Sequence, residues 1–307
     1  MPVNPQAQGH LPGQRFIDPD VLARIDNLEL IARGVVDGFI SGLHRSPMLG
    51  MSVDFAEHRA YMPGDDVRRI DWRLFARTDR LFIKEFEADS NANLHLLLDV
   101  SASMDYGSGA VTKLDYAKFL AASLAYLSRR QRDRIGLITF DDKIVDVIPP
   151  SIRHFNTVLH ALDRLSAGAA GSYAEPLAKI APSLGRRSLV VLISDLYASP
   201  EQLLRAVNQL RLRGNDLIVF HLLDPLELSL ELGDVASVED LESGVTLPIE
   251  TERHRDSYRS LIEQHRATLE RVFGGNRIDY IFADISQPLD NILFRYLSDR
   301  ERRSKTR

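Results

Sequence analysis

The sequence predicts a doubly wound α/β fold with a mostly parallel sheet of six strands and one antiparallel edge strand. From residue 92 onward, apolar runs of strand length alternate with helix-length segments, the pattern of a mostly parallel sheet covered on both faces. The chain has 307 residues, of which 44% are hydrophobic and 26% charged. This composition suits one large domain with a smaller appendage.

The expected strands of the sheet cover residues 94–98, 134–140, 144–148, 188–193, 217–223 and 277–282. The expected helices cover residues 113–130, 155–165, 174–184, 200–213, 256–273 and 289–299. Only Asp141, Asp142 and Lys143 separate the second strand from the third. Because three residues are too few for a parallel crossover, the third strand is expected to be antiparallel at the edge.

The domain organisation is expected to comprise a disordered tail (1–14), a small amino-terminal α+β module (15–90) and the α/β domain (91–300). The module would hold one helix beginning at Asp18-Pro19 and short strands near 52–55 and 81–86. Residues 59–72 between those strands carry both charges and the only tryptophan. We expect this segment to clasp the module onto the α/β domain with Trp72 buried at the junction. Residues 227–250 read as an excursion with two short strands.

Composition excludes several classes of function. The net charge of −5 and pI near 6.0 give no support for a nucleic-acid-binding face. The absence of cysteine excludes disulfides, thiolate catalysis and zinc–thiolate sites. No stretch has the length and apolar character of a membrane span, and residues 1–13 lack the apolar core of a signal peptide. We therefore expect a cytoplasmic protein.

Two aspartates end neighbouring strands and predict a metal site. Asp99 ends the first strand and is followed by Ser101 and Ser103, and Asp195 ends the fourth strand. In a doubly wound sheet these strands lie side by side, about 4.8 Å apart, at the crevice where ligands bind. A divalent cation would relieve the repulsion between the carboxylates, and hydroxyl oxygens suit Mg²⁺ first, with Mn²⁺ or Ca²⁺ as alternatives. The alternative without a metal site is that Asp99 and the serines cap the next helix.

The motif Asp99-Val100-Ser101-Ala102-Ser103 and the Ser194-Asp195 pair resemble the metal-ion-dependent adhesion site of von Willebrand factor A domains. Further motifs widen the resemblance, namely Pro63-Gly64-Asp65-Asp66, Asp71-Trp72 and Asp224-Pro225-Leu226-Glu227. Over residues 40–300 the chain resembles the bacterial family known as domain of unknown function 58, usually encoded beside MoxR-type AAA+ ATPases. The resemblance implies a metal site of Asp99, Ser101, Ser103 and Asp195. Ser172 stands where these domains usually have threonine.

The function expected from these observations is a metal-dependent protein-interaction module and not an enzyme. The resemblance implies that the partner is a MoxR-type AAA+ ATPase or its client, which would present a carboxylate to the metal. A metal-dependent phosphohydrolase is the first alternative, although it needs a second acid where this chain has Ser101. A nucleotide-binding module is disfavoured because Gly168-Ala169-Ala170-Gly171 lacks the phosphate-binding lysine. A scaffold with a vestigial metal site is the remaining alternative.

Overall fold

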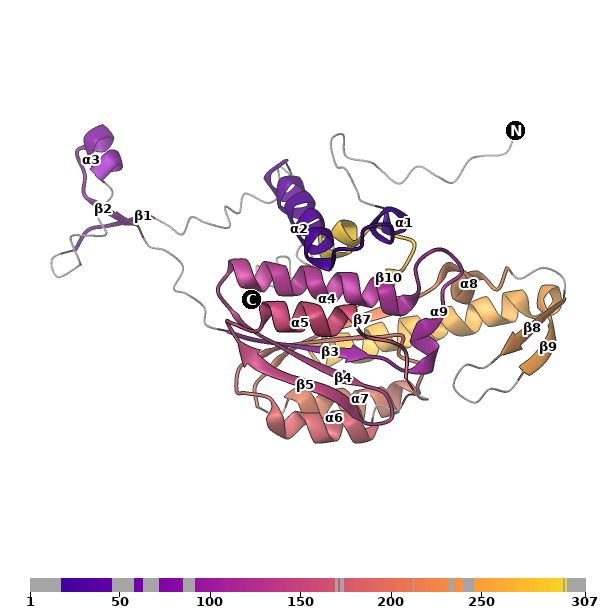
Figure 1. Ribbon diagram of the computed structural model, residues 1–307. Coiled ribbons are helices and arrows are strands. Elements are labelled where there is room, and N and C mark those ends of the chain that lie inside the picture. The colour runs from indigo at the N-terminus through magenta and orange to yellow at the C-terminus, as the bar shows by residue number, and fades with distance from the viewer. Residues whose placement is uncertain are drawn as a thin grey trace, which may run out of the picture.

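The computed structural model describes residues 18–45, 58–62, 72–84, 92–168, 171, 174–211, 213–231, 235–239, 246–294 and 296. Its centre is a six-stranded sheet (Figure 1). The strands are β3 (Asn93–Asp99), β4 (Arg134–Phe140), β5 (Ile144–Ser151), β6 (Leu189–Ser194), β7 (Asp216–Leu223) and β10 (Asp279–Asp284). Their order is β10-β7-β6-β3-β4-β5, and β5 alone in this sheet pairs antiparallel. The predicted fold class and edge hairpin are confirmed.

Helices cover both faces of the sheet (Figure 1). One face carries α2 (Leu28–Arg45), α4 (Lys113–Arg130) and α5 (Phe155–Asp163), and the other carries α6 (Ala174–Ile180), α7 (Pro200–Arg211) and α9 (Thr251–Gly275). Leu96 and Leu98 of β3 enter the first hydrophobic core and Leu97 the second. All three are fully buried. Burial of each leucine stabilises the fold by about 1.5–3 kcal/mol, which explains why this strand is apolar at successive positions.

The predicted first helix is divided in two. α1 (Pro19–Leu22) begins as expected, because the Asp18 carboxylate accepts a hydrogen bond from the Asp20 N–H at 2.9 Å. The break before α2 arises at Asn27, whose side-chain oxygen accepts from the Leu30 N–H at 2.9 Å and caps a new helix. The expectation of one helix beginning at Asp18-Pro19 is therefore wrong.

Helix α2 packs on α4 and shares the hydrophobic core of the first face of the sheet through Ile31, Val35 and Phe39. Two exposed ion pairs, Arg129–Glu29 (3.0 Å) and Arg130–Asp37 (3.3 Å), also cross between these helices. Such pairs contribute at most about 1 kcal/mol each, so apolar burial dominates the docking of α2. The division into domains at residue 90 stays a prediction.

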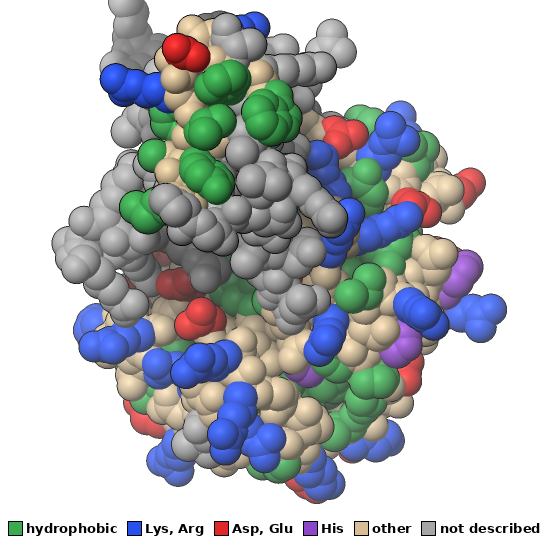
Figure 2. Space-filling model, turned by 90° about the vertical axis from the view of Figure 1, so that its left-hand side faces the viewer, with side chains coloured by type: hydrophobic (Ala, Val, Ile, Leu, Met, Phe, Trp, Pro, Cys, Tyr) green, Lys and Arg blue, Asp and Glu red, His purple; other side chains and the backbone are tan. Residues whose placement is uncertain are grey.

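The prediction that Trp72 is buried is wrong. β1 (His58–Ala60) pairs with β2 (Phe82–Lys84), and Trp72 opens α3 (Trp72–Thr78). Its side chain is 61% exposed and contacts Phe75 of the same helix edge-to-face, with ring centroids 6.1 Å apart. Figure 2 views this side of the molecule and shows hydrophobic side chains gathered near the top of the face.

The excursion after β7 begins with α8 (Pro225–Ser229) and continues into an antiparallel pair, β8 (Val235–Glu239) and β9 (Thr246–Glu250). The two short strands expected there are confirmed. The expected tail (1–14) and the expected strand at 52–55 lie outside the described residues. In the described part of the chain, no helix has the length and apolar character needed to cross a membrane.

Candidate metal-binding site

Asp99 lies at the carboxyl end of β3, beside the end of β6, as predicted. Leu98 is in register with Ile193, so Asp99 faces Ser194 on the neighbouring strand. The Ser101 N–H donates to Asp99 Oδ1 at 2.9 Å, and the Ser194 hydroxyl donates to Asp99 Oδ2 at 2.7 Å. Asp99 is only 1% exposed. Its carboxylate is thus fixed in place by the turn that follows it and by the adjacent strand.

Ser101 and Ser103 lie on the turn after β3. The 3₁₀ turn η2 (Ala102–Asp105) follows Ser101 and brings both hydroxyls to one side, with their oxygens 3.2 Å apart. Both side chains are buried. The structure therefore brings together three of the predicted ligands, Asp99, Ser101 and Ser103, as a cluster of oxygen atoms.

Asp195 is also at this end of the sheet and fully buried, but its carboxylate has a partner that sequence reasoning missed. The Lys113 ammonium donates to Asp195 Oδ2 at 2.8 Å and to Glu227 Oε1 at 2.6 Å. The Lys113 side chain has no exposed surface. Burial lowers the pKa of Lys113, but Asp195 and Glu227 together outweigh that effect and leave the pKa raised. The lysine is therefore charged.

Two signals in the sequence could have revealed this ion cluster. Lys113 is the first residue of α4, where the helix dipole disfavours a positive charge. A buried lysine at this position therefore indicates an acidic partner. Glu227 follows Asp224-Pro225 at capping-box spacing. The Asp224 N–H donates to Glu227 Oε2 at 2.8 Å, and the Leu226 N–H donates to Asp224 Oδ1 at 2.8 Å. This capping box aims the second oxygen of Glu227 at the lysine.

The electrostatics of Asp99 suit a site that attracts cations. Burial and, second, the Asp195 charge raise the pKa of Asp99, and together they outweigh the hydrogen bonds from Ser194 and Ser101, so that its pKa lies at about 6. At neutral pH the Asp99 carboxylate is therefore largely negative, and it lies at the same end of the sheet as Asp195, which Lys113 contacts.

Two histidines support the turn that carries Asp195. His221 of β7 hydrogen-bonds with the backbone of Asp195, and His265 of α9 with the backbone of Leu196. Leu196 has a positive φ of 54°, an unusual conformation for leucine. Burial lowers the pKa of His221 to about 3, so its ring is neutral. These histidines act from behind the site and not as ligands.

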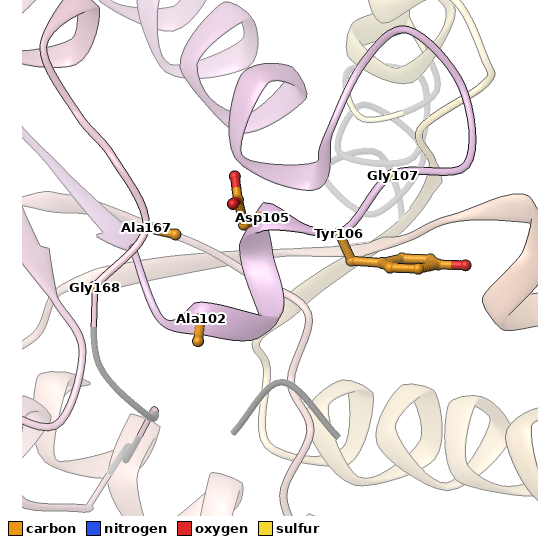
Figure 3. A pocket seen from close by; sticks show the side chains of 6 residues that line it. All are labelled: Ala102, Asp105, Tyr106, Gly107, Ala167 and Gly168. Carbon is orange, nitrogen blue, oxygen red and sulfur yellow. The ribbon is translucent and has the colours of Figure 1, made fainter. Parts of the chain in front are cut away.

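Ser172, the fifth predicted ligand, lies outside the described residues. The segment before it approaches the site, because the Gly168 N–H donates to the Val100 carbonyl at 2.6 Å. An open pocket of about 370 Å³ lies between this segment and η2, lined by Ala102, Asp105, Tyr106, Gly107, Ala167 and Gly168. In Figure 3 the Tyr106 ring points away from the Ala167–Gly168 segment. Small side chains thus leave room beside the turn that carries the serines.

The cluster fits a hard divalent cation in donor type and in charge. Within the described residues, no three His, Cys, Asp or Glu side chains group as metal ligands, so a site here depends on serine hydroxyls. Asp99, Asp195 and Glu227 against the single Lys113 ammonium give a formal net charge of −2. A divalent cation would neutralise that charge.

Comparison with known proteins identifies the family. Residues 57–268 match the family described as "Protein of unknown function DUF58", which is more than half of the chain. The chain belongs to this family. The uncharacterized protein Rv1480 of Mycobacterium tuberculosis is 30% identical to this DUF58 chain over 265 residues, covering 84% of this chain and 83% of that protein.

Solved structures also resemble this DUF58 chain. An aerotolerance-related membrane protein from Bacteroides fragilis aligns with 68% of this chain and 99% of its own, at 16% identity and a TM-score of 0.46. The SpRpn10 VWA domain aligns with 66% of this chain and 93% of its own, at 12% identity and a TM-score of 0.38. The strand order and flanking helices described above are those of a von Willebrand A-like fold.

Proposed function

We propose that this DUF58 protein is an interaction module that binds a divalent cation, most simply Mg²⁺, at the end of β3 and β6. The observation that supports this most directly is the buried Asp99 carboxylate beside the Ser101 and Ser103 hydroxyls. Asp195 contributes charge from the neighbouring strand, and Ser172 stays a proposed ligand. We propose no catalytic activity for the protein and, as expected from its sequence, a cytoplasmic location.

A bound cation would supply a coordination position for a carboxylate of a partner protein. The chain's own residues prepare for this contact: Ser101 and Ser194 hold the Asp99 carboxylate through both oxygens. The pocket lined by Ala102, Asp105 and Gly168 offers space for the partner's side chain next to η2. Since a single carboxylate contact is weak after desolvation, neighbouring surface must contribute to binding.

The partner we propose is a MoxR-type AAA+ ATPase or its client. Support for this partner comes from the resemblance of the sequence to DUF58 proteins encoded beside such ATPases. Asp105 lines the pocket and is exposed. Its charge would favour a partner with a basic residue next to the carboxylate that reaches the metal.

A melting experiment tests the metal site. A ligand at a hundred times its Kd stabilises a protein by about 2.7 kcal/mol, so added Mg²⁺ should raise the Tm of the wild type. The shift should be absent in Asp99→Ala and retained in Asp146→Ala, which removes an exposed carboxylate of β5. Equal shifts in all three proteins would place the cation elsewhere. No shift in any of them would favour the scaffold with a vestigial site.

The partner is tested separately by affinity capture and mass spectrometry with Mg²⁺ or with EDTA. We expect a MoxR-type ATPase or its client to be captured with Mg²⁺ and to be lost with EDTA. A complex that forms equally well in EDTA would show that the partner docks without the metal.

A further inference from the structure

We propose that Lys113 is the built-in counterion of Asp195 and that its charge sets the affinity of the neighbouring metal site. The inference rests on the proposed function, because it concerns the same site. The Lys113 side chain has no exposed surface, and its ammonium contacts two carboxylates at 2.8 and 2.6 Å.

The position of Lys113 is fixed from several directions. The Thr112–Asp115 capping box starts α4 and fixes the backbone at Lys113. The rings of Tyr197 and Tyr106 lie 4.9 and 6.0 Å from the ammonium. Cation–π attraction and two charge-assisted hydrogen bonds favour the charged lysine in this one arrangement. The ammonium is therefore a permanent positive charge beside Asp195.

The charge of Lys113 acts on a cation in two ways. It occupies Asp195 Oδ2, whereas Asp99 accepts hydrogen bonds from the Ser101 N–H and the Ser194 hydroxyl. It also repels any further positive charge nearby, and this repulsion is strong where protein excludes water. The wild-type site should thus bind a divalent cation more weakly than the same oxygen atoms would without the lysine.

The same contacts connect the site to a distant part of the chain. Glu227 belongs to the cap of α8, and the Ser108 N–H donates to Asp224 Oδ2 of that cap at 2.8 Å. Lys113 thereby joins the end of β6 to the start of the excursion that carries β8 and β9. The cap of α8, at the start of the excursion, is therefore part of the structure that holds the lysine in place.

The test is calorimetric titration of the protein with Mn²⁺ alone at pH 7.5. Lys113→Met removes the charge and keeps an unbranched apolar side chain. We expect it to bind Mn²⁺ on the order of tenfold more tightly than the wild type. Lys118→Met is the matched control on the same helix, since Lys118 pairs with Asp115 at 3.6 Å away from the cluster. Its Mn²⁺ affinity should equal that of the wild type.

The outcomes separate this inference from the proposed function. If the wild type binds Mn²⁺ and Lys113→Met binds no more tightly, the inference is wrong and the metal site stands. If Lys113→Met alone binds Mn²⁺, the inference stands and the wild-type metal site fails. If neither protein binds, both are wrong.

Loss of the ammonium could also unfold the protein, because it leaves Asp195 and Glu227 unpaired. Circular dichroism with and without Mn²⁺ decides that case. Folding that depends on Mn²⁺ supports the inference, since the metal then replaces the lysine charge. For an unfolded Lys113→Met, Lys113→Gln keeps a donor without the charge and is titrated instead. If it too stays unfolded at every Mn²⁺ concentration, the lysine is a structural element alone and the inference is overturned.

Discussion

The substitution Asp99→Asn should stabilise the metal-free protein while removing its response to metal. Burial raises the pKa of Asp99 from 3.8 to about 6, with Asp195 as the second cause. The native protein therefore binds more protons than the unfolded chain between those pH values, and stability is lost as pH rises through that window. The difference corresponds to about 3 kcal/mol at pH 7.5.

Asparagine resembles the neutral form of the side chain and avoids this cost. Its Oδ1 can still accept from the Ser101 N–H, and its Nδ2 can donate to the Ser194 hydroxyl. In EDTA at pH 7.5 we expect the Tm of Asp99→Asn to exceed that of the wild type by about 6 °C or more. At pH 4 the two proteins should differ far less, because Asp99 is then largely neutral in the native wild type. Added Mg²⁺ should raise the Tm of the wild type only.

Differential scanning calorimetry in EDTA at several pH values provides the measurement. Asp105→Asn is the control, because Asp105 is an exposed carboxylate on η2 and its loss should change stability by less than about 0.5 kcal/mol. An Asp99→Asn protein that melts at or below the wild-type Tm at pH 7.5 would refute the electrostatic account of the site.

Two further predictions concern the core. Burial raises the pKa of Asp290 to about 6, and its Oδ1 has no hydrogen-bond partner among the residues that the structure describes. Urea unfolding of Asp290→Asn should therefore show a free energy of unfolding about 1–3 kcal/mol higher than the wild type at pH 8 and nearly unchanged below pH 4. An equal gain at both pH values would contradict this reasoning. Gly136→Ala places a Cβ 2.8 Å from the Ile148 carbonyl of β5 and should lower the free energy of unfolding by about 1–3 kcal/mol. As a control, Gly274→Ala, whose Cβ meets nothing within 4 Å, should not destabilise α9. Similar urea midpoints for the two variants would refute the steric argument.

The sequence by itself determined the architecture of the sheet. The apolar run that ends at Asp99 can be buried only between two layers of helices, and right-handed crossovers place the strand ending at Asp195 beside it. The three-residue link at 141–143 forces the antiparallel edge. The proximity of the two aspartates therefore follows from local patterns and general rules of chain connection. Ser101 and Ser103 follow from their distance of two and four residues from Asp99.

Only the tertiary structure decided which groups surround those carboxylates. Lys113 and Glu227 are 114 residues apart in sequence, and their contact depends on how the amino-terminal ends of α4 and α8 come together. Neither helix pattern contains that information, because periodicity identifies the buried face of a helix but not the side chain opposite its first residue. Trp72 is a second example. Its large aromatic side chain predicts burial, but its neighbours in the fold leave the side chain 61% exposed. Long-range packing, which short sequence patterns do not encode, thus decided whether Asp195 stands alone or is paired with a lysine.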